Sequence, residues 1–400
     1  MTPESPTSCS SSRLTSWLAL GVVAWLSVFV FSGFGLFAYL ASWLPLSPTF
    51  YVSCACLLTL LLMAIAPDLR RNFLGQRALL WFGGYLLVSL AWYIFFPQSH
   101  ESIEALKDHA NMTLVFCCCL AAFQLPEAFR LGRTLIAWVV VISCFINMYA
   151  VFFPIENSTF GWRSAAFYIN PNECAYALAL GSLVGIGVVP ERFRGLFLAL
   201  VIPGVALTFS RSGALMLAVL LPGMLWAGLL KRRHLGLALL GCLAVLVSLL
   251  AVFIQLGELA GARARFFTTG FVERLSLVTN DASGQDRLTL LDKGWEYIHR
   301  APWFGNGLDC IQNSASGEGP HVEYVALMMN YGVWAVILYP LLVLVIVPRN
   351  RLGLLALVAL LGLGFFDHNL LDSLEMPLVY AALATLAATS APRLRTEYRP

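Results

Sequence analysis

The chain contains 400 residues, of which 59% are hydrophobic and 12% charged, with a formal net charge of +3 at pH 7. Soluble domains carry about 25% charged residues, so this composition excludes an ordinary water-soluble globular protein. No basic block is interleaved with aromatic residues, so we expect no nucleic-acid partner. Residues 1–13, rich in Ser, Thr and Pro, are predicted to be a disordered cytoplasmic leader, because the following apolar run is too long for a signal peptide.

Apolar runs follow along almost the whole chain. A transmembrane helix needs about 20 apolar residues, since the hydrocarbon core of a bilayer is about 30 Å thick. A hydropathy window therefore predicts about twelve transmembrane helices, some of them short. The runs lie at 14–43, 49–66, 77–97, 110–125, 134–153, 173–189, 195–210, 212–230, 235–256, 322–347, 351–366 and 376–390.

The stretch 195–230 is apolar throughout except around Arg211. As one helix it would be about 54 Å long, well beyond the thickness of the hydrocarbon core. An Arg at the centre of a bilayer also costs about 2.5–3.5 kcal/mol. We therefore predict two helices with a tight turn at Arg211, which places this side chain at an interface or in a polar cavity.

The basic residues set the predicted orientation. With both termini inside, the inner segments hold most of the Lys and Arg residues, whereas the short outer loops hold only Lys107, Arg163 and Arg211. Short cytoplasmic loops are enriched in Lys and Arg, so this orientation is favoured. The outer segments then carry the acidic residues Glu101, Glu104, Asp108, Asp367, Asp372 and Glu375.

We therefore expect an all-α, polytopic membrane protein with one long periplasmic loop that contains short amphipathic helices. Transmembrane helices 1–9 occupy 14–256, the loop 257–321, helices 10–12 occupy 322–390, and 391–400 is a cytoplasmic tail.

The long loop contains a second kind of pattern. Over residues 286–299, Leu288, Leu291, Trp295 and Ile298 recur at helical spacing, which predicts an amphipathic helix along the membrane surface. Pro302, Gly305 and Gly307 then predict a tight turn before the next apolar run.

Motifs of metal-dependent or nucleotide-dependent chemistry are absent from the sequence. We find no H-E-x-x-H, P-loop, DxD-type pair or Cys/His cluster. Most of the ten cysteines fall inside apolar runs, where Cys behaves as a small hydrophobic residue. We expect no metal site and no cofactor.

Four polar motifs lie in segments predicted to be outside. They read R-S-A-A-F-Y-I-N-P-N-E-C-A from Arg163 to Ala175, T-F-S-R-S-G from Thr208 to Gly213, Arg287 through P-W-F-G-N-G at 302–307, and H-V-E-Y-V-A-L-M-M-N-Y-G from His321 to Gly332. Their order, spacing and predicted topology resemble the O-antigen ligase and O-antigen polymerase superfamily of bacterial envelope glycosyltransferases. The family commonly has Asn directly after the histidine, where this chain has Val322.

The resemblance implies transfer of a glycan from an undecaprenyl-pyrophosphate carrier at the periplasmic face of the bacterial inner membrane, without nucleotide sugar or metal. A pyrophosphate leaving group concentrates negative charge, which guanidinium groups bind while they stay charged. We therefore predict that Arg211 and Arg287 form a pyrophosphate clamp. His321 is the predicted general base, because His titrates nearest the working pH.

Further residues are expected to contact the substrates. Arg163, Asn170 and Asn172 are predicted donor contacts or loop-shaping residues. Arg265, with Arg263 and Arg274, is a candidate for binding anionic head groups or a phosphorylated core sugar, although loop solvation is the commoner role.

Structural roles compete with each of these interpretations. His321 would be a helix cap, Arg211 a snorkelling topology anchor, Arg287 a partner of Asp286 or Glu296, and Asn172 a helix N-cap. Asp367 and His368 are the reserve candidates for the base. The other histidines, His100, His109, His234 and His299, are expected to be loop or interface residues.

The leading functional interpretation is an O-antigen ligase that joins the glycan to a lipid A-core acceptor. Membrane lipids are expected to surround the protein. A polymerase with a carrier-linked acceptor, or an oligosaccharyltransferase acting on protein, uses the same donor. A transporter or flippase is the alternative of another class. Transporters tend to show internal repeats and ionisable residues near the midplane, whereas the polar residues here gather at the predicted outer face.

Overall fold

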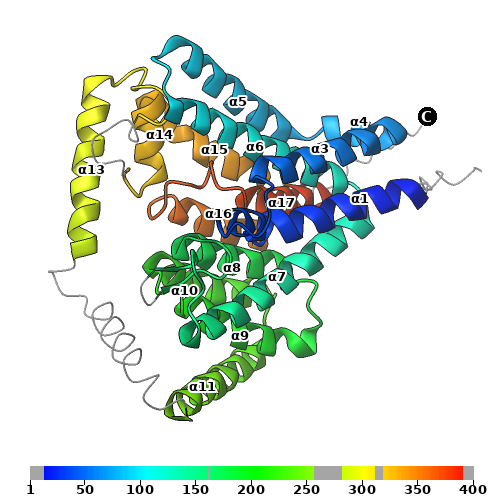
Figure 1. Ribbon diagram of the computed structural model, residues 1–400. Coiled ribbons are helices and arrows are strands. Elements are labelled where there is room, and N and C mark those ends of the chain that lie inside the picture. Colours follow the sequence, from blue (N-terminus) through cyan, green and yellow to red (C-terminus); the bar gives the residue numbers. More distant parts are fainter. Residues whose placement is uncertain (1–12, 161–162, 256–281, 311–318, 391–400) are drawn as a thin grey trace, which may run out of the picture.

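The computed structural model describes residues 13–160, 163–255, 282–310 and 319–390, and nearly all regular structure in this part of the chain is helical (Figure 1). The α-helices are α1 (Arg13–Leu26), α2 (Phe34–Leu40), α3 (Pro48–Ile65), α4 (Pro67–Leu74), α5 (Arg77–Phe95), α6 (His100–Ala122), α7 (Pro126–Phe152), α8 (Pro171–Gly185), α9 (Arg194–Ala206), α10 (Arg211–Trp226), α11 (Arg232–Gln255), α13 (Ala282–Arg300), α14 (Glu323–Tyr331), α15 (Leu338–Ile346), α16 (Arg351–Leu363) and α17 (Met376–Ser390). A π-helical turn, Ser27–Phe31, extends α1, and 3-10 turns occupy Glu191–Phe193 and Val333–Ile337.

Helix α8 lies at the centre of the bundle. Every residue from Cys174 to Gly185 is buried, and α7, α9, α10 and α17 pack around the helix. Large apolar side chains instead face outward on peripheral helices, for example Leu80 on α5 and Leu239 on α11. A protein whose outer surface is this apolar is solvated by lipid, which agrees with an all-α membrane protein.

Five helical segments of the described chain are long and apolar enough to cross a membrane. They are Arg13–Phe31, Pro48–Ile65, Arg77–Phe95, Pro126–Phe152 and Arg232–Leu249. The total of about twelve spans and the orientation stay predictions.

The predicted break near Arg211 is confirmed. Helix α9 ends at Ala206 and α10 begins at Arg211. Ser210 is the N-cap of α10, since its hydroxyl accepts a hydrogen bond from the backbone N–H of Gly213 at 3.2 Å. The short turn 207–210 therefore separates two helices that the apolar pattern alone would merge.

Two other apolar runs are not the single helices that were predicted. The run 14–43 breaks at Gly33, which has a φ of 72°, and the run 322–347 breaks at Gly332, which has a φ of 100°. A Cβ at Gly332 would collide with the backbone carbonyl of Trp303. Only glycine adopts this backbone conformation at so close an approach, so packing between distant segments overrides the local helical pattern.

The amphipathic helix predicted at 286–299 is present as α13, which packs on α14 and lies across one end of the bundle (Figure 1). Its packing face agrees in part with the predicted apolar face. Ile298 is buried and Leu291 packs against the same cluster, whereas Leu288 and Trp295 are exposed. The predicted turn after α13 is confirmed, with a φ of 67° at Gly305 and 94° at Gly307.

The described residues also contain one short hairpin. Strands β1 (Thr159–Phe160) and β2 (Arg163–Ser164) pair antiparallel, with Phe160 opposite Arg163. The backbone N–H of Ser164 donates to the carbonyl of Leu207 at 3.3 Å. The hairpin is therefore held against the turn between α9 and α10.

Candidate functional site

His321 lies immediately before α14, half-buried, at the end of the bundle where α13 also lies. Its ring packs edge-on against the ring of His368, with centroids 5.0 Å apart. Burial, the nearby His368 and the charge of Arg287 together lower the pKa of His321 to about 4. The imidazole is therefore neutral at physiological pH and has a lone pair free to accept a proton.

The position of His368 is set by hydrogen bonds within the 364–375 loop, which joins α16 to α17. The carboxylate of Asp367 accepts from the backbone N–H of His368 at 2.7 Å and of Asn369 at 3.1 Å. Glu323, only 2% exposed, accepts from the N–H of Leu370 at 3.0 Å. Asp367 is itself 6% exposed, so it shapes the loop, while His368 faces the candidate base.

Val322 stands where the family commonly has Asn, and it is the N-cap of α14 without any side-chain hydrogen bond. The N–H of Glu323 donates to the carbonyls of Gly364 at 2.9 Å and Asp367 at 2.7 Å. At the start of a helix, a polar side chain commonly accepts the hydrogen bond of a free N–H. Here backbone carbonyls accept from the N–H of Glu323 instead.

Arg163 lies on β2 and binds two segments that are distant from it in the sequence. Its Nε donates to the carbonyl of Thr208 at 3.0 Å, and its Nη2 donates to Oδ1 of Asn172 at 2.9 Å. The N-cap of α8 is Asn170, whose Oδ1 accepts from the N–H of Asn172 at 2.9 Å. The alternative of Asn172 as the cap is therefore wrong, because its amide oxygen is taken by Arg163.

Arg211 is the first residue of α10 and is exposed. Its helix packs against α8, where a Cβ added at Gly213 would collide with the side chain of Ala175. Arg211 therefore follows directly on the turn that carries Thr208, the hydrogen-bond partner of Arg163.

A row of contacts links these motifs to His321. Glu173, next to Asn172 in the chain, accepts a hydrogen bond from Asn369 at 3.4 Å. Asn369 in turn adjoins His368, which packs on His321. The segments carrying Arg163, Arg211, Arg287 and His321 thus meet around the 364–375 loop, whereas Arg265 lies outside the described residues.

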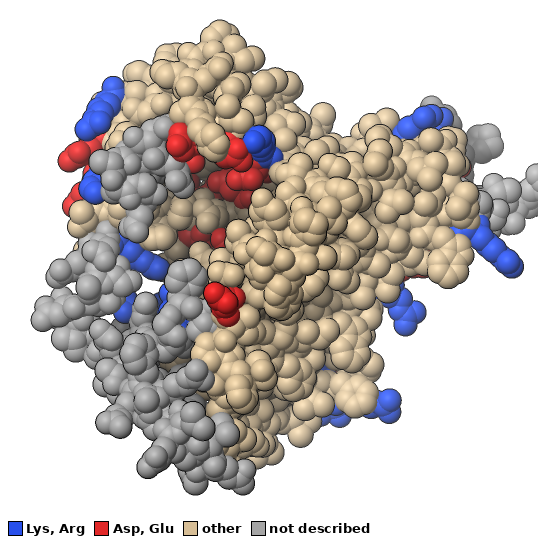
Figure 2. All heavy atoms as spheres, in the orientation of Figure 1, with Lys and Arg blue, Asp and Glu red and all other residues tan. Residues whose placement is uncertain are grey.

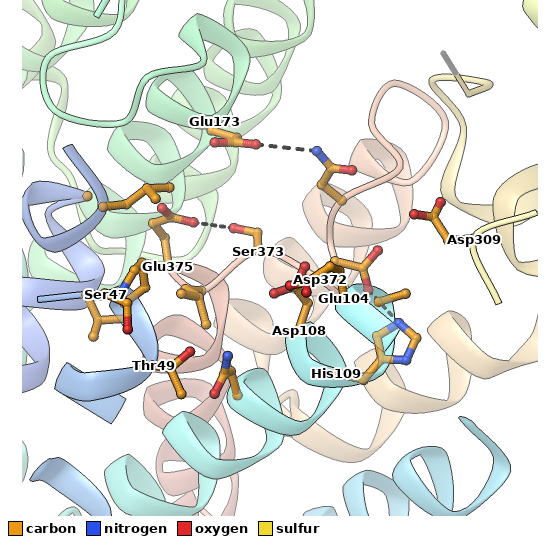
Figure 3. A pocket seen from close by; sticks show the side chains of 18 of the residues that line it. Ser47, Thr49, Glu104, Asp108, His109, Glu173, Asp309, Asp372, Ser373 and Glu375 are labelled. Carbon is orange, nitrogen blue, oxygen red and sulfur yellow. Dashed lines mark hydrogen bonds and ion pairs between the residues drawn. The ribbon is translucent and has the colours of Figure 1, made fainter. Parts of the chain in front are cut away.

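The 364–375 loop also forms one wall of a cavity of about 550 Å³. Figure 3 shows Glu173, Asp372, Asp108 and Asp309 around this space. Among the described residues, the lining includes six carboxylate side chains and neither lysine nor arginine. The six are Glu104 and Asp108 of α6, Glu173 of α8, Asp309 of the turn after α13, and Asp372 and Glu375 of the loop.

The charge distribution is visible on the surface. Figure 2 shows acidic side chains gathered around a hollow on the left of the view, with basic side chains just below them. Basic side chains also lie at the opposite end, on the right, where Figure 1 places the start of α1 and α4.

His109 closes the cavity on the side of α5 and α6. It is 3% exposed, and its Nε2 lies 2.8 Å from Oδ1 of Asp372 and 3.0 Å from the hydroxyl of Tyr85. Its Nδ1 lies 3.0 Å from the hydroxyl of Ser89, which is 2.8 Å from that of Tyr331. The expectation of a loop or interface residue was wrong for His109, because a buried polar network holds it.

Two of the cavity carboxyls are shifted toward the neutral form. Burial, followed by repulsion from Asp372, raises the pKa of Asp309 to about 6 and that of Asp108 to about 6. Asp108 precedes the predicted span 110–125, and Asp309 lies in the turn between α13 and α14. The cavity therefore resists full ionisation, because its carboxyls are buried and their charges are alike.

No motif groups these carboxylates in the sequence; the one signal is the excess of acidic residues in the predicted outer segments. Among the described residues, no three His, Cys, Asp or Glu side chains lie close enough together to hold a metal ion. The cavity is therefore distinct in chemistry from a metal centre built of these residues.

Fold and site together define an α-helical membrane protein with a histidine–arginine site and an acidic cavity at one end of the bundle. Residues 196–340 match the family described as O-antigen ligase. This part of the chain is therefore similar to a family of ligase and polymerase transferases. The matched region includes Arg211, Arg287 and His321.

No curated protein and no solved structure matches the chain.

Proposed function

We propose that this protein is an O-antigen ligase, which transfers a glycan from undecaprenyl pyrophosphate to a lipid A-core acceptor at the periplasmic face of the inner membrane. The observation that carries the proposal is the half-buried imidazole of His321, which packs on His368 and lies within electrostatic reach of the Arg287 guanidinium. A group that accepts a proton then adjoins a group that stabilises a phosphate leaving group.

The reaction is a single displacement. His321 removes the proton of the acceptor hydroxyl, whose oxygen forms a bond to the anomeric carbon of the donor glycan. The bond from that carbon to the phosphate oxygen breaks, and undecaprenyl pyrophosphate leaves with the electron pair. Attack opposite the leaving group inverts the anomeric configuration, so a product with retained configuration would contradict this mechanism.

The arginines act on the leaving group. Arg287 and Arg211 stabilise the charge that develops on the departing pyrophosphate, and Arg163 with Asn170 and Asn172 shapes the donor-binding loop. Bound pyrophosphate also offsets the positive charge of Arg287 that lowers the pKa of His321. The imidazole becomes a stronger base when the donor is in place.

The acceptor separates the ligase from its alternatives. An O-antigen polymerase or a related oligosaccharyltransferase would use the same donor chemistry with a carrier-linked glycan or a protein as acceptor. A polysaccharide or lipid transporter is disfavoured because the candidate site residues and the cavity carboxylates gather at one end of the bundle. The compact chain with one long loop favours the ligase.

The test is complementation of a strain that lacks the protein, with envelope glycans separated on a gel. We expect His321→Ala to leave lipid A-core without O-antigen and to let long carrier-linked polymer accumulate. His299→Ala, an exposed histidine of α13, is the matched control and is expected to restore the ladder. A complete ladder with His321→Ala would contradict the base assignment, and core bearing one repeat unit would indicate a polymerase.

A further inference from the structure

The acidic cavity is continuous with the proposed active site. His368 lines the cavity, and its ring packs on that of His321 at 5.0 Å between centroids. A substrate group in the cavity therefore lies beside the candidate base. Its volume of about 550 Å³ falls within the range of about 300–1,000 Å³ that is typical of small-molecule pockets.

The charge of the cavity excludes the donor's leaving group. In the part of the chain that the structure describes, six carboxylates and neither lysine nor arginine line the cavity, and like charge repels a pyrophosphate from such a wall. The donor therefore occupies the arginine side of His321. The cavity remains for the acceptor.

The cavity also holds a buried polar group without a partner. Tyr51 of α3 lines the cavity and is 1% exposed, and its hydroxyl makes no hydrogen bond within the described structure. Its ring is fixed by stacking on Phe29, with centroids 4.8 Å apart. A buried, unpaired hydroxyl costs about 1–3 kcal/mol, which a ligand that donates to the phenol oxygen would remove.

We propose that this cavity is the acceptor subsite and that it takes an amino sugar whose free ammonium group is held by the carboxylates. The proposal rests on the proposed function and adds the chemical class of the acceptor. An ammonium group donates hydrogen bonds to carboxylates and to a phenol oxygen, and it has no acceptor atom of its own. It also neutralises the repulsion among Asp108, Asp309 and Asp372.

An organic cation fits this cavity better than a metal ion. The six carboxylates come from four separate segments, and no three of the described acidic, His or Cys side chains converge on a metal-sized point. Carboxylates spread over the wall of a larger space suit a sugar that carries its charge on one substituent.

The test measures binding without donor and without transfer. Full-length protein in lipid nanodiscs is titrated with the tetramer of β-1,4-linked glucosamine, in the presence of EDTA so that no metal bridges the groups. The N-acetylated tetramer is the matched neutral probe. We expect the ammonium form to bind at least about ten times more tightly at pH 7.5.

The double variant Asp108→Asn, Asp309→Asn is expected to weaken binding of the ammonium form at least about tenfold and to leave the neutral probe unchanged. The control Asp292→Asn, Glu296→Gln removes the same charge from exposed positions on α13 and is expected to bind as the wild type does. If the double variant fails to fold, Asp309→Asn alone carries the test, since Asp309 lies in a turn.

Equal affinity for the two tetramers, no binding of either, or tight binding that survives the cavity substitutions would overturn the proposal. Because no glycan is transferred in this experiment, its failure leaves the His321→Ala test readable. Conversely, a failed complementation test leaves the binding result intact.

Discussion

The site around His321 and the acidic cavity are neighbours with opposite charge. On one side, burial, His368 and the charge of Arg287 lower the pKa of the histidine; on the other, burial and repulsion from Asp372 raise the pKa of Asp309. His368 belongs to both, since it lines the cavity and packs on His321. The difference teaches that charge is able to sort two substrates, as we propose for an anionic leaving group and a cationic acceptor on opposite sides of one base.

The strongest test of the basic side is Arg287→Ala. Removing a group that stabilises developing charge lowers a rate about 10²–10³-fold, and we expect that fall in glycan transfer by purified protein. Arg287→Lys keeps the charge but not the paired N–H donors, so it should lose less. Arg300→Ala, on the same helix but exposed, is the control; a loss below threefold with Arg287→Ala would remove this residue from the clamp.

The basic and the acidic side of the site also predict two different pH dependences, the first of which concerns transfer from the donor. His321 accepts a proton only when neutral, and with its pKa lowered to about 4 it is neutral above that pH. We expect kcat/KM for the donor to stay constant between pH 5 and 8, because His321 does not titrate in that interval. Below about pH 4, it should fall about tenfold per pH unit. A limb near the ordinary pKa of histidine would show that burial does not act on the base.

On the acidic side, Asp108 and Asp309 are charged only above their raised pKa of about 6. The groups whose charges act on them are Asp372, Glu104, Glu101, His109 and Lys107. Since a carboxyl becomes neutral as pH falls through its pKa, the affinity advantage of the wild type over the variant Asp108→Asn, Asp309→Asn should shrink several-fold between pH 7.5 and 5. Protonation of the glucosamine tetramer itself cancels in this ratio. An unchanged ratio over this interval would separate these two residues from ammonium binding.

A smaller effect is expected where the donor loop is held together. Asn172→Ala removes the bond from Arg163 and should lower the free energy of unfolding by about 1 kcal/mol, since the pair is only half-buried. A double-mutant cycle with Arg163→Ala, read as the thermal midpoint and as transfer rate, measures the coupling. Additive losses would mean that Asn172 acts independently of Arg163, as a residue that contacts the glycan donor directly.

The smallest effect is expected at Val322. Because backbone carbonyls already accept from the N–H of Glu323, Val322→Asn should change transfer less than twofold. Val322→Ala controls for lost packing. A gain of tenfold or more with Asn would assign the side chain found in the family a direct role in the reaction.

Local pattern was enough to predict most of the helices. Hydropathy is a property of neighbouring residues, so α3, α5, α7 and α11 follow from their apolar runs, and the break before α10 follows from the position of Arg211. The breaks at Gly33 and Gly332 were missed because their cause is not local. Each glycine touches the backbone of a distant segment, at Phe167 and at Trp303.

The acidic cavity was missed for the same reason. The cavity is lined by residues that are far apart in the sequence, such as Glu104 of α6 and Glu375. Likewise, no local pattern around His109 predicts its contact with Asp372. The available signal was the excess of acidic residues in the predicted outer segments. We used that excess only to orient the chain in the membrane, although charge gathered on one face is also typical of a binding site.

The hydrogen bond between Glu173 and Asn369 joins residues 196 positions apart, and this has a consequence for biosynthesis. The ribosome makes α8 long before it makes the 364–375 loop, so the segments that carry Arg163 and Arg211 precede one of their packing partners. His321 is likewise made before His368, on which its ring packs. A chain cut short before the 364–375 loop lacks part of the pocket wall, and both proposed substrate sites are complete only when this loop has been made.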